Sequence, residues 1–247
     1  MARWSRPVAE AFIRWVDPPR RQRWLDVGCG TGALSGQILQ LASPVELLAI
    51  DPSSSFIAYA QRCYPDDRLN FQVGDALMLP VKDDCVDIAV SGLALNFFPE
   101  PLTALAEMTR AVRLGGKVAL YVWDYAGQMQ FLRTFWDAAV KLDPAANEFD
   151  EGVRFPLCRP DHLRALFEQV GLLAVDVQAI DVPTVFQDFD DYWLPFLGGT
   201  GPAPSYVASL IDSQRAALKF QLAKTLPTNS NGSIALIARA WAVQGKV

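Results

Sequence analysis

Short apolar segments alternate with amphipathic segments through the first half of the chain, and this alternation limits the folds open to it. The apolar segments have the length of strands, and the segments between them have helical spacing. The predicted strands are 23–27, 45–50, 69–73, 86–91 and 117–123, and the predicted helices between them are 33–41, 53–63 and 101–112. Strands that alternate with helices predict a parallel sheet with helices on both of its faces.

The second half of the chain departs from this pattern. Helices are predicted at 126–142 and 160–170, strands at 172–182 and 233–243, and helical pieces interrupted at 198–204 over 188–225. We therefore expect two closing strands with a helical insertion between them. Because an insertion of this length is uncommon as a structureless loop, we expect it to fold.

Trp4, Val8, Phe12 and Trp15 recur at helical spacing ahead of the first strand. They predict an amphipathic helix over residues 5–16. The expected organisation is one domain in three parts. These are an N-terminal helix and lid at 1–20, a core of 21–185 and 231–247, and a helical cap inserted at 186–230.

Composition excludes several classes of function. The 247 residues carry 22 basic and 27 acidic side chains, and a net charge of −5 makes a poor electrostatic partner for nucleic acid. The most apolar stretches, such as 86–98, fall short of the ~18 residues that span a bilayer. The first residues also lack the apolar core of a secretory signal. We therefore expect a cytoplasmic monomer or homodimer that acts on a small molecule, with no nucleic-acid or membrane partner.

The cysteines give no sign of a metal centre. Cys29, Cys63, Cys85 and Cys158 form no Cys-x-x-Cys motif, and the chain contains a single histidine. Structural and catalytic zinc sites need three or four such ligands at close spacing. We expect no metal site.

A cluster of glycines, Gly28-Cys-Gly-Thr-Gly32, stands between the first predicted strand and the helix that follows it. A loop of this kind brings backbone amides and a helix N-terminus beside a ligand, and its alternative role is a tight turn without a ligand. With Ala33 it satisfies G-x-G-x-x-G/A, and Asp51 follows Gly28 by 23 residues. This spacing fits a nicotinamide dinucleotide as well as another adenosine ligand. Asp26, two residues before the loop, is unfavourable beside a pyrophosphate and suits a cationic ligand.

Five segments in order carry a resemblance to a known family. They are Leu25-Asp-Val-Gly-Cys-Gly-Thr-Gly32, Ala49-Ile-Asp-Pro-Ser53, Gly74-Asp-Ala-Leu-Met-Leu-Pro80, Asp87-Ile-Ala-Val-Ser-Gly-Leu93 and Arg113-Leu-Gly-Gly-Lys117. Together they resemble the motifs of class I S-adenosylmethionine-dependent methyltransferases, of the broad group that includes the ubiquinone and menaquinone C-methyltransferases. The resemblance covers roughly residues 22–125.

The resemblance implies a fold, a cofactor and a set of binding residues. The implied fold is an α/β, Rossmann-like, doubly wound mixed sheet of seven strands, the last of them antiparallel, with the helical cap insertion. The implied cofactor is S-adenosyl-L-methionine. The implied binding residues are Asp26, Gly28, Cys29, Gly30, Asp51, Pro52, Asp75, Ala76, Ser91 and Leu93.

Each acidic residue in this set has a role and an alternative. The resemblance gives Asp51 to the ribose hydroxyls and Asp75 to the adenine amino group. Their alternatives are a helix N-cap for Asp51 and a turn residue for Asp75. Asp26 is expected to hold the ligand's ammonium through Gly30 or a water. Cys29 is expected to be a small filler.

Methyl transfer in line from a sulfonium depends mainly on positioning and on a dry pocket, so it requires few catalytic side chains. Asp124, just past the fifth strand, and His162 are weak candidates for a general base. The aromatic residues of the insertion, Phe186, Phe189, Tyr192, Trp193, Phe196 and Tyr206, line an acceptor pocket or form the core of the cap. We favour the core, because a short helical subdomain must bury apolar side chains of its own to fold.

The sequence therefore predicts methyl transfer from S-adenosylmethionine to a small molecule. It leaves open whether carbon, oxygen or nitrogen is methylated. The turn after the fourth strand lacks the Asn/Asp-Pro-Pro-aromatic sequence of enzymes that methylate the exocyclic amines of bases. The alternatives are an NAD-dependent oxidoreductase, a non-catalytic or donor-binding scaffold of the same fold, and other chemistry on the same cofactor.

Overall fold

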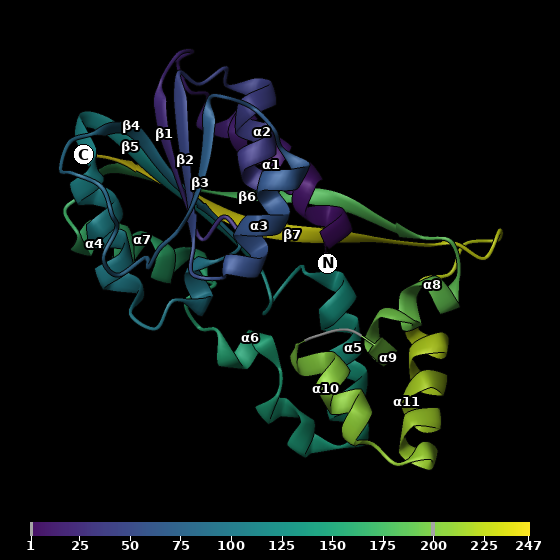
Figure 1. Cartoon of the computed structure of the whole chain (residues 1–247). Helices are drawn as coiled ribbons and strands as arrows, with labels where there is room; N and C mark the ends of the chain where they lie inside the picture. The colour runs from purple at the N-terminus through teal and green to yellow at the C-terminus, as the bar shows by residue number, and fades with distance from the viewer. Residues whose placement is uncertain (1, 199–200) are drawn as a thin grey trace. The chain divides into compact units, whose positions relative to one another are not determined.

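The computed structural model describes residues 2–198 and 201–247 (Figure 1). Seven strands form one sheet in the order β3-β2-β1-β4-β5-β7-β6. The strands are β1 (Arg23–Val27), β2 (Glu46–Asp51), β3 (Leu69–Val73), β4 (Val86–Gly92), β5 (Val112–Trp123), β6 (Leu173–Phe186) and β7 (Ile234–Lys246). The predicted seven-stranded α/β sheet is confirmed.

The sheet is mixed, as expected. β1 pairs in parallel with β2 and β4, and further parallel pairs join β2 to β3 and β4 to β5. The amide of Gly115 donates to the carbonyl of Val247, and the amide of Asp124 donates to the carbonyl of Arg239. Residue numbers thus rise along β5 while they fall along β7, so the last strand is antiparallel.

Two compact units divide the chain, and each is described by itself. The first unit contains residues 1–122, 159–180 and 240–247, and the second contains 123–158 and 181–239. The helices of the first unit are α1 (Ala2–Val16), α2 (Ala33–Leu41), α3 (Ser54–Cys63), η1 (Leu95–Phe97), α4 (Pro101–Ala111) and α7 (Pro160–Gln169). In Figure 1, α1, α2 and α3 lie on one side of the strands and α4 and α7 on the other, which is the predicted two-faced arrangement.

The N-terminal helix packs into the first unit through one face. Val8, Phe12 and Val16 are fully buried, and the ring of Phe12 lies 4.7 Å from that of Tyr121 on β5. These residues follow the helical period of the sequence, so the amphipathic pattern predicted the helix and its buried face. The helix begins at Ala2, three residues before the predicted start.

The second unit is built around helices. They are α5 (Gln130–Leu142), η2 (Pro144–Glu148), α6 (Glu151–Arg154), α8 (Phe189–Trp193), α9 (Pro195–Gly198), α10 (Pro202–Ser209) and α11 (Asp212–Thr225). α5, expected within the core, packs against α10 and α11 of the predicted insertion. The short helices η2 and α6 were not predicted. The predicted interruption at 198–204 includes 199–200, which lie outside the described residues, and α10 begins just beyond it.

One strand boundary differs because of a local irregularity. β5 begins at Val112 instead of Lys117, and its register against β4 shifts between the pairs Val86–Val112 and Ile88–Lys117. The predicted strand begins at 117, just after the pair Gly115-Gly116, and this pair lies inside the irregularity. Glycine takes the positive φ of 78° at position 115 without steric cost. Among the described residues no helix is long and apolar enough to cross a membrane.

Candidate functional site

A cavity of about 490 Å³ lies in the first unit, beside the loops that follow β1, β2 and β4. This volume is in the range of ordinary small-molecule sites. The lining residues are Ser5, Asp26, Gly28, Cys29, Gly30, Thr31, Ala33, Leu34, Asp51, Pro52, Ser53, Phe56, Gly92, Leu93, Ala94, Phe97, Phe98 and Tyr121. Seven of the ten predicted cofactor residues are among them. The structure therefore brings most of the predicted site to one place, at the carboxyl ends of parallel strands.

Asp51 ends β2 and ties two loops together. Its Oδ2 accepts a hydrogen bond of 2.9 Å from the amide of Gly30, and its Oδ1 accepts one of 2.9 Å from the amide of Ser53. The alternative role as N-cap belongs to Ser53, whose hydroxyl accepts from the amide of Phe56. Each carboxylate oxygen has a second lone pair, so Asp51 retains the capacity to accept from a ligand's hydroxyls.

Asp26 is fully buried at the end of β1. Its Oδ2 accepts a hydrogen bond of 2.6 Å from the hydroxyl of Ser35 on α2, while its Oδ1 has no hydrogen-bond partner. Burial, with a contribution from the nearby Asp51, raises the pKa of Asp26 to about 7. Among the described residues this buried oxygen has no partner, and it belongs to a residue that lines the cavity, so it fits a ligand with a cationic group. Such a group would donate the hydrogen bond that Oδ1 lacks, and its positive charge would stabilise the ionised carboxylate.

The glycine loop is fixed to the neighbouring strand. The amides of Gly28 and Cys29 both donate to the carbonyl of Ile50, at 2.8 and 3.0 Å. Gly28 has a φ of +73°, and a Cβ there would lie 2.6 Å from that of Ala94, so both the conformation and the close approach require glycine. Gly30 has a φ of +54° and open space where a Cβ would stand.

Cys29 packs beneath the loop. Its side chain belongs to a core cluster with Ala49, Ile57 and Phe71. Burial, reinforced by Asp26 and Asp51, raises the pKa of its thiol above the ordinary range. Cys29 is therefore held as a neutral thiol, which agrees with the predicted role of a small filler.

Three predicted cofactor residues are not among those that line this cavity. Asp75 is exposed, and its Oδ1 accepts from the amide of Leu77, as a turn residue does. Ala76 is buried beside it. Ser91 is fully buried, and its hydroxyl has no hydrogen-bond partner.

Sequence reasoning missed several lining residues. Ser5 comes from α1, Phe56 from α3, and Phe97 and Phe98 from the turn after β4. Phe56 and Phe97 are 49% and 63% exposed. The local strand–turn pattern does not indicate that these rings lie at the rim of a cavity, so the sequence contained no signal for them. Tyr121 was missed because the apolar run of β5 makes it resemble a core residue. Its pairing with Gly92 across the sheet was the signal available only in three dimensions.

Neither weak candidate for a general base lines the cavity. Asp124 is 6% exposed, and its Oδ2 accepts from the amide of Gln128 in the turn before α5. Its carboxylate also occupies the space that a Cβ on Gly127 would need. His162 is exposed on α7, 3.8 Å from the carboxylate of Asp161. Asp124 is thus a turn-forming residue within the second unit.

The aromatic residues of the second unit pack against one another. The ring of Phe196 stacks on those of Phe131 and Phe135, at 4.6 and 4.4 Å, and the hydroxyl of Tyr192 donates to the carbonyl of Phe131. Among the buried aromatic side chains of this unit are Phe131, Phe135, Trp136, Phe186, Tyr192, Trp193, Phe196 and Tyr206. They form the core of this unit, as the sequence favoured.

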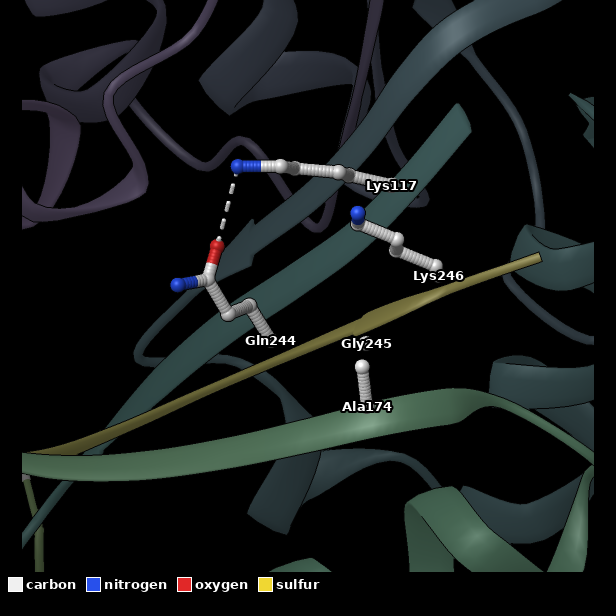
Figure 2. Close-up of a pocket in the computed structure, with 5 residues that line it drawn as sticks. All are labelled: Lys117, Ala174, Gln244, Gly245 and Lys246. Atoms are coloured by element: carbon white, nitrogen blue, oxygen red, sulfur yellow. Dashed lines mark hydrogen bonds between the residues drawn. The ribbon is translucent and has the colours of Figure 1, made fainter. Parts of the chain in front are cut away.

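A second, smaller cavity of about 100 Å³ is lined by Lys117, Ala174, Gln244, Gly245 and Lys246 (Figure 2). The ammonium of Lys117 donates to the carbonyl of Val16, at 2.8 Å, and to Oε1 of Gln244, at 3.4 Å. Lys117 therefore satisfies the C-terminus of α1, where a cation is favoured by the helix dipole. Burial and the neighbouring Lys246 lower the pKa of this lysine. The hydrogen bonds of Lys117 join α1 to the last strand, so the residues at this cavity have a structural role.

Comparisons with known proteins agree with this geometry. Residues 25–120 match the family model described as a methyltransferase domain. The chain is 33% identical to a malonyl-[acyl-carrier protein] O-methyltransferase of Methylococcus capsulatus, over 54% of this chain and 50% of the relative. It is 35% identical to a ubiquinone/menaquinone biosynthesis C-methyltransferase of Dinoroseobacter shibae, over 44% of this chain and 45% of the relative. The chain thus spans about half the length of the curated relatives it matches.

The fold also has a solved counterpart. The chain is similar to phosphoethanolamine N-methyltransferase 2 of Haemonchus contortus, solved with phosphomonomethylethanolamine and S-adenosylhomocysteine. The TM-score is 0.60 at 15% identity, over 96% of this chain and 52% of that one. Residues 25–120 of the chain thus match a methyltransferase domain in sequence, and the whole chain shares the fold of a solved methyltransferase.

Proposed function

We propose that this chain transfers the methyl group of S-adenosylmethionine to a small-molecule acceptor. The observation that supports this most strongly is the pair of buried carboxylates, Asp26 and Asp51, that line one cavity on either side of the glycine loop. The donor has hydroxyls at its ribose and a cationic ammonium at its methionine end, so it offers one group to each carboxylate.

Within this proposal the two carboxylates set the direction of the donor. Asp51 accepts from the ribose hydroxyls, and its existing bonds to Gly30 and Ser53 hold the carboxylate in place. Asp26 receives the ammonium at its unpartnered Oδ1. A dinucleotide would place a pyrophosphate against Asp26, which is electrostatically unfavourable, and this argues against the oxidoreductase alternative.

The end of α2 supplies a complementary site for an anion. Gly32, the N-cap of α2, provides no side-chain hydrogen bond to the first turn, which also contains no acidic residue. Thr31, Ala33 and Leu34 line the cavity at this end. The amides of a helix's first turn lack intrahelical partners, and together with the positive end of the helix dipole they favour a carboxylate, so we place the donor's carboxylate here.

When bound, the donor supplies an electrophilic methyl group on a sulfonium, and the chain supplies position and shelter from water. Well-held reactants gain roughly 7–11 kcal/mol from positioning alone. Phe56, Phe97 and Phe98 are the apolar side chains at the cavity that can exclude water from the reacting atoms. No proton acceptor is needed when the acceptor atom is already anionic.

The class of acceptor is a further part of the proposal. The two curated relatives are named for transfer to oxygen and to carbon, and both names describe small metabolites or their carrier-bound forms. The acidic charge of the chain argues against a nucleic-acid acceptor. We therefore propose a small molecule, with carbon and oxygen as the first atoms to test.

The test is calorimetric titration of S-adenosylmethionine, S-adenosylhomocysteine and NAD into the wild type and Asp51→Ala. Micromolar binding of the first two, weakened by the substitution and absent for NAD, is the expected result. Asp66→Ala is the matched control, because Asp66 pairs with Arg68 at the surface and does not line the cavity. Binding of NAD alone, or of none of the three ligands, would contradict the proposal.

Transfer is measured separately, as release of S-adenosylhomocysteine. One reaction contains a carboxylic acid acceptor and another a hydroquinone, and both use the wild type and Asp51→Ala. Release in one of them that depends on Asp51 would identify the class of acceptor. Donor binding without release from a broad set of small acceptors would favour a domain that binds the donor and does not transfer its methyl group.

A further inference from the structure

Tyr121 stands opposite Asp26 on one face of the sheet. The strands β1, β4 and β5 are adjacent in that order, and the register pairs Asp26 with Val90 and Gly92 with Tyr121. Paired residues of a parallel ladder share a face, as do alternate residues of one strand. Asp26, Gly92 and Tyr121 therefore point to the same face, with Gly92 between the other two.

Gly92 leaves the space through which the tyrosine side chain crosses the sheet. A Cβ at position 92 would lie 2.6 Å from the hydroxyl oxygen of Tyr121. The phenol thus lies over β4 and is directed from β5 toward β1. All three residues line the cavity of about 490 Å³.

The ring and the backbone of Tyr121 are both held in place. The side chain is 2% exposed, and its ring packs against that of Phe12 on α1. The backbone carbonyl of Tyr121 accepts from the amide of Leu93, at 2.8 Å. Among residues 2–198 and 201–247, Oδ1 of Asp26 is buried without a hydrogen-bond partner. The phenol of Tyr121 crosses Gly92 toward it, and both residues line the same cavity. Buried polar groups in native proteins are normally satisfied, so this carboxylate oxygen indicates a partner group on a ligand, which the nearby phenol can also contact.

The charge state of the two groups defines the chemistry of that partner. Burial and the nearby Asp26 raise the pKa of Tyr121, so its phenol stays neutral and keeps a lone pair to offer. Asp26 offers an acceptor oxygen and, once ionised, a negative charge. Two acceptors with a negative charge between strands are complementary to a donor of several hydrogen bonds with a positive charge, and an ammonium group has three such donors.

We propose that Asp26 and Tyr121 form a two-sided site for the ammonium group of the donor, and that Gly92 is required to keep it open. The ammonium donates one hydrogen bond to Oδ1 of Asp26 and one to the hydroxyl oxygen of Tyr121. Tyr121 is thus a donor-binding residue that no sequence motif marks. This inference rests on the proposed function, because it assumes that S-adenosylmethionine occupies the cavity.

The experiment compares two ligands that differ in the methionine part. S-adenosylhomocysteine carries the ammonium, and 5′-methylthioadenosine keeps the adenosine and the sulfur but lacks it. Both are titrated into the wild type, Tyr121→Phe and Tyr192→Phe. The control Tyr192→Phe also removes one buried hydroxyl, which donates to the carbonyl of Phe131 in the second unit. Thermal unfolding of each variant checks that it is folded.

In Tyr121→Phe we expect affinity for S-adenosylhomocysteine to fall about 10-fold, the effect of one hydrogen bond to a charged group. Affinity for 5′-methylthioadenosine stays within twofold, and both affinities stay unchanged in Tyr192→Phe. Unchanged binding of S-adenosylhomocysteine, or an equal loss for both ligands, would overturn the inference. If the wild type binds neither ligand, the proposed function fails as well, so the two failures are distinguishable.

Two further variants test the pairing itself. Gly92→Ala adds the Cβ that displaces the phenol while Tyr121 is retained. This variant should lose affinity for S-adenosylhomocysteine by a similar factor. In Asp26→Asn/Tyr121→Phe the combined loss should be smaller than the product of the two single losses, because both groups bind one ammonium. If the affinity loss of the double variant equals the product of the two single losses, the two residues act on different parts of the ligand, and the shared site is overturned.

Discussion

The amide of Gly30 donates a 2.9 Å hydrogen bond to the carboxylate of Asp51, 21 residues further along the chain. The bond joins the glycine loop after β1 to the end of β2. It gives Asp51 a structural task in addition to the proposed contact with the ribose. Substitutions at Asp51 therefore report on both tasks, and ligand binding and stability must be measured together.

Asp51→Ala should lose donor binding by at least 10-fold and should also unfold more easily. The partly buried amides of Gly30 and Ser53 lose their acceptor, and each lost hydrogen bond costs about 0.5–1.5 kcal/mol. Calorimetry with S-adenosylhomocysteine gives the first quantity, and urea unfolding gives the second. Asp75→Ala is the comparison, because Asp75 is exposed and does not line the cavity. A larger loss of affinity for Asp75→Ala than for Asp51→Ala would contradict the placement of the site.

Binding of S-adenosylhomocysteine should tighten as pH rises from 5.5 to 7.5. The pKa of Asp26 is raised to about 7 in the free protein, so below this pH the carboxyl is mostly neutral. A bound ammonium favours the carboxylate, so binding at low pH must first release a proton, at a cost of up to about tenfold in affinity per pH unit. The slope flattens above pH 7, where Asp26 is already ionised in the free protein. Titrations across this range measure the slope.

Asp26→Asn is the control for this pH dependence, since it removes the titrating group while keeping its shape. The slope should disappear in the variant, and a slope that persists would assign the titration to another group. Stability gives an independent check. A carboxyl whose folded pKa is raised binds protons on folding, so wild-type stability from this group falls as pH rises from about 4 to about 7. The free energy of unfolding of Asp26→Asn, relative to that of the wild type, should therefore be higher at pH 8 than at pH 5.

Gly28→Ala and Gly30→Ala should separate folding from ligand binding. Both positions have positive φ, which costs a non-glycine residue about 1–2 kcal/mol. At Gly28 a Cβ also meets Ala94 at 2.6 Å, so overpacking should add about 1–3 kcal/mol to that loss. At Gly30 the Cβ enters open space in the cavity, so the main effect should be weaker donor binding. Thermal unfolding and calorimetry on both variants check the order, and a larger stability loss for Gly30→Ala would contradict it.

Asp124→Ala should destabilise the chain by about 1–3 kcal/mol and leave the affinity for S-adenosylhomocysteine unchanged. Its carboxylate accepts from the amide of Gln128 and fills the turn at Gly127, so its loss leaves a partly buried donor without a partner. Chemical unfolding monitored by tryptophan fluorescence gives the first effect and titration gives the second. A stable variant with weakened donor binding would return Asp124 to the candidate site.

The strand–helix order and the two carboxylates at strand ends could be predicted from the sequence because they depend on local patterns. Apolar runs of strand length, glycines beside a strand and helical spacing are properties of neighbouring residues. For the same reason the placement of Asp26, Gly28, Gly30 and Asp51 at one cavity followed from the rule that parallel strands end at a common edge. The start of β5 was misplaced because a Gly-Gly pair is read as a break when its partner strand is unknown.

Tertiary structure alone decided which side chains meet across strands and helices. Tyr121 reads in the sequence as one more core residue of β5, and only its register against Gly92 directs its hydroxyl toward Asp26. Ser5 reaches the cavity because α1 packs through a buried face. Asp75 and Asp124 follow strands, as ligand-binding residues do, but their carboxylates accept hydrogen bonds within turns. The physical reason is that periodicity fixes the face on which a residue lies, whereas packing and strand register fix the partner that it meets.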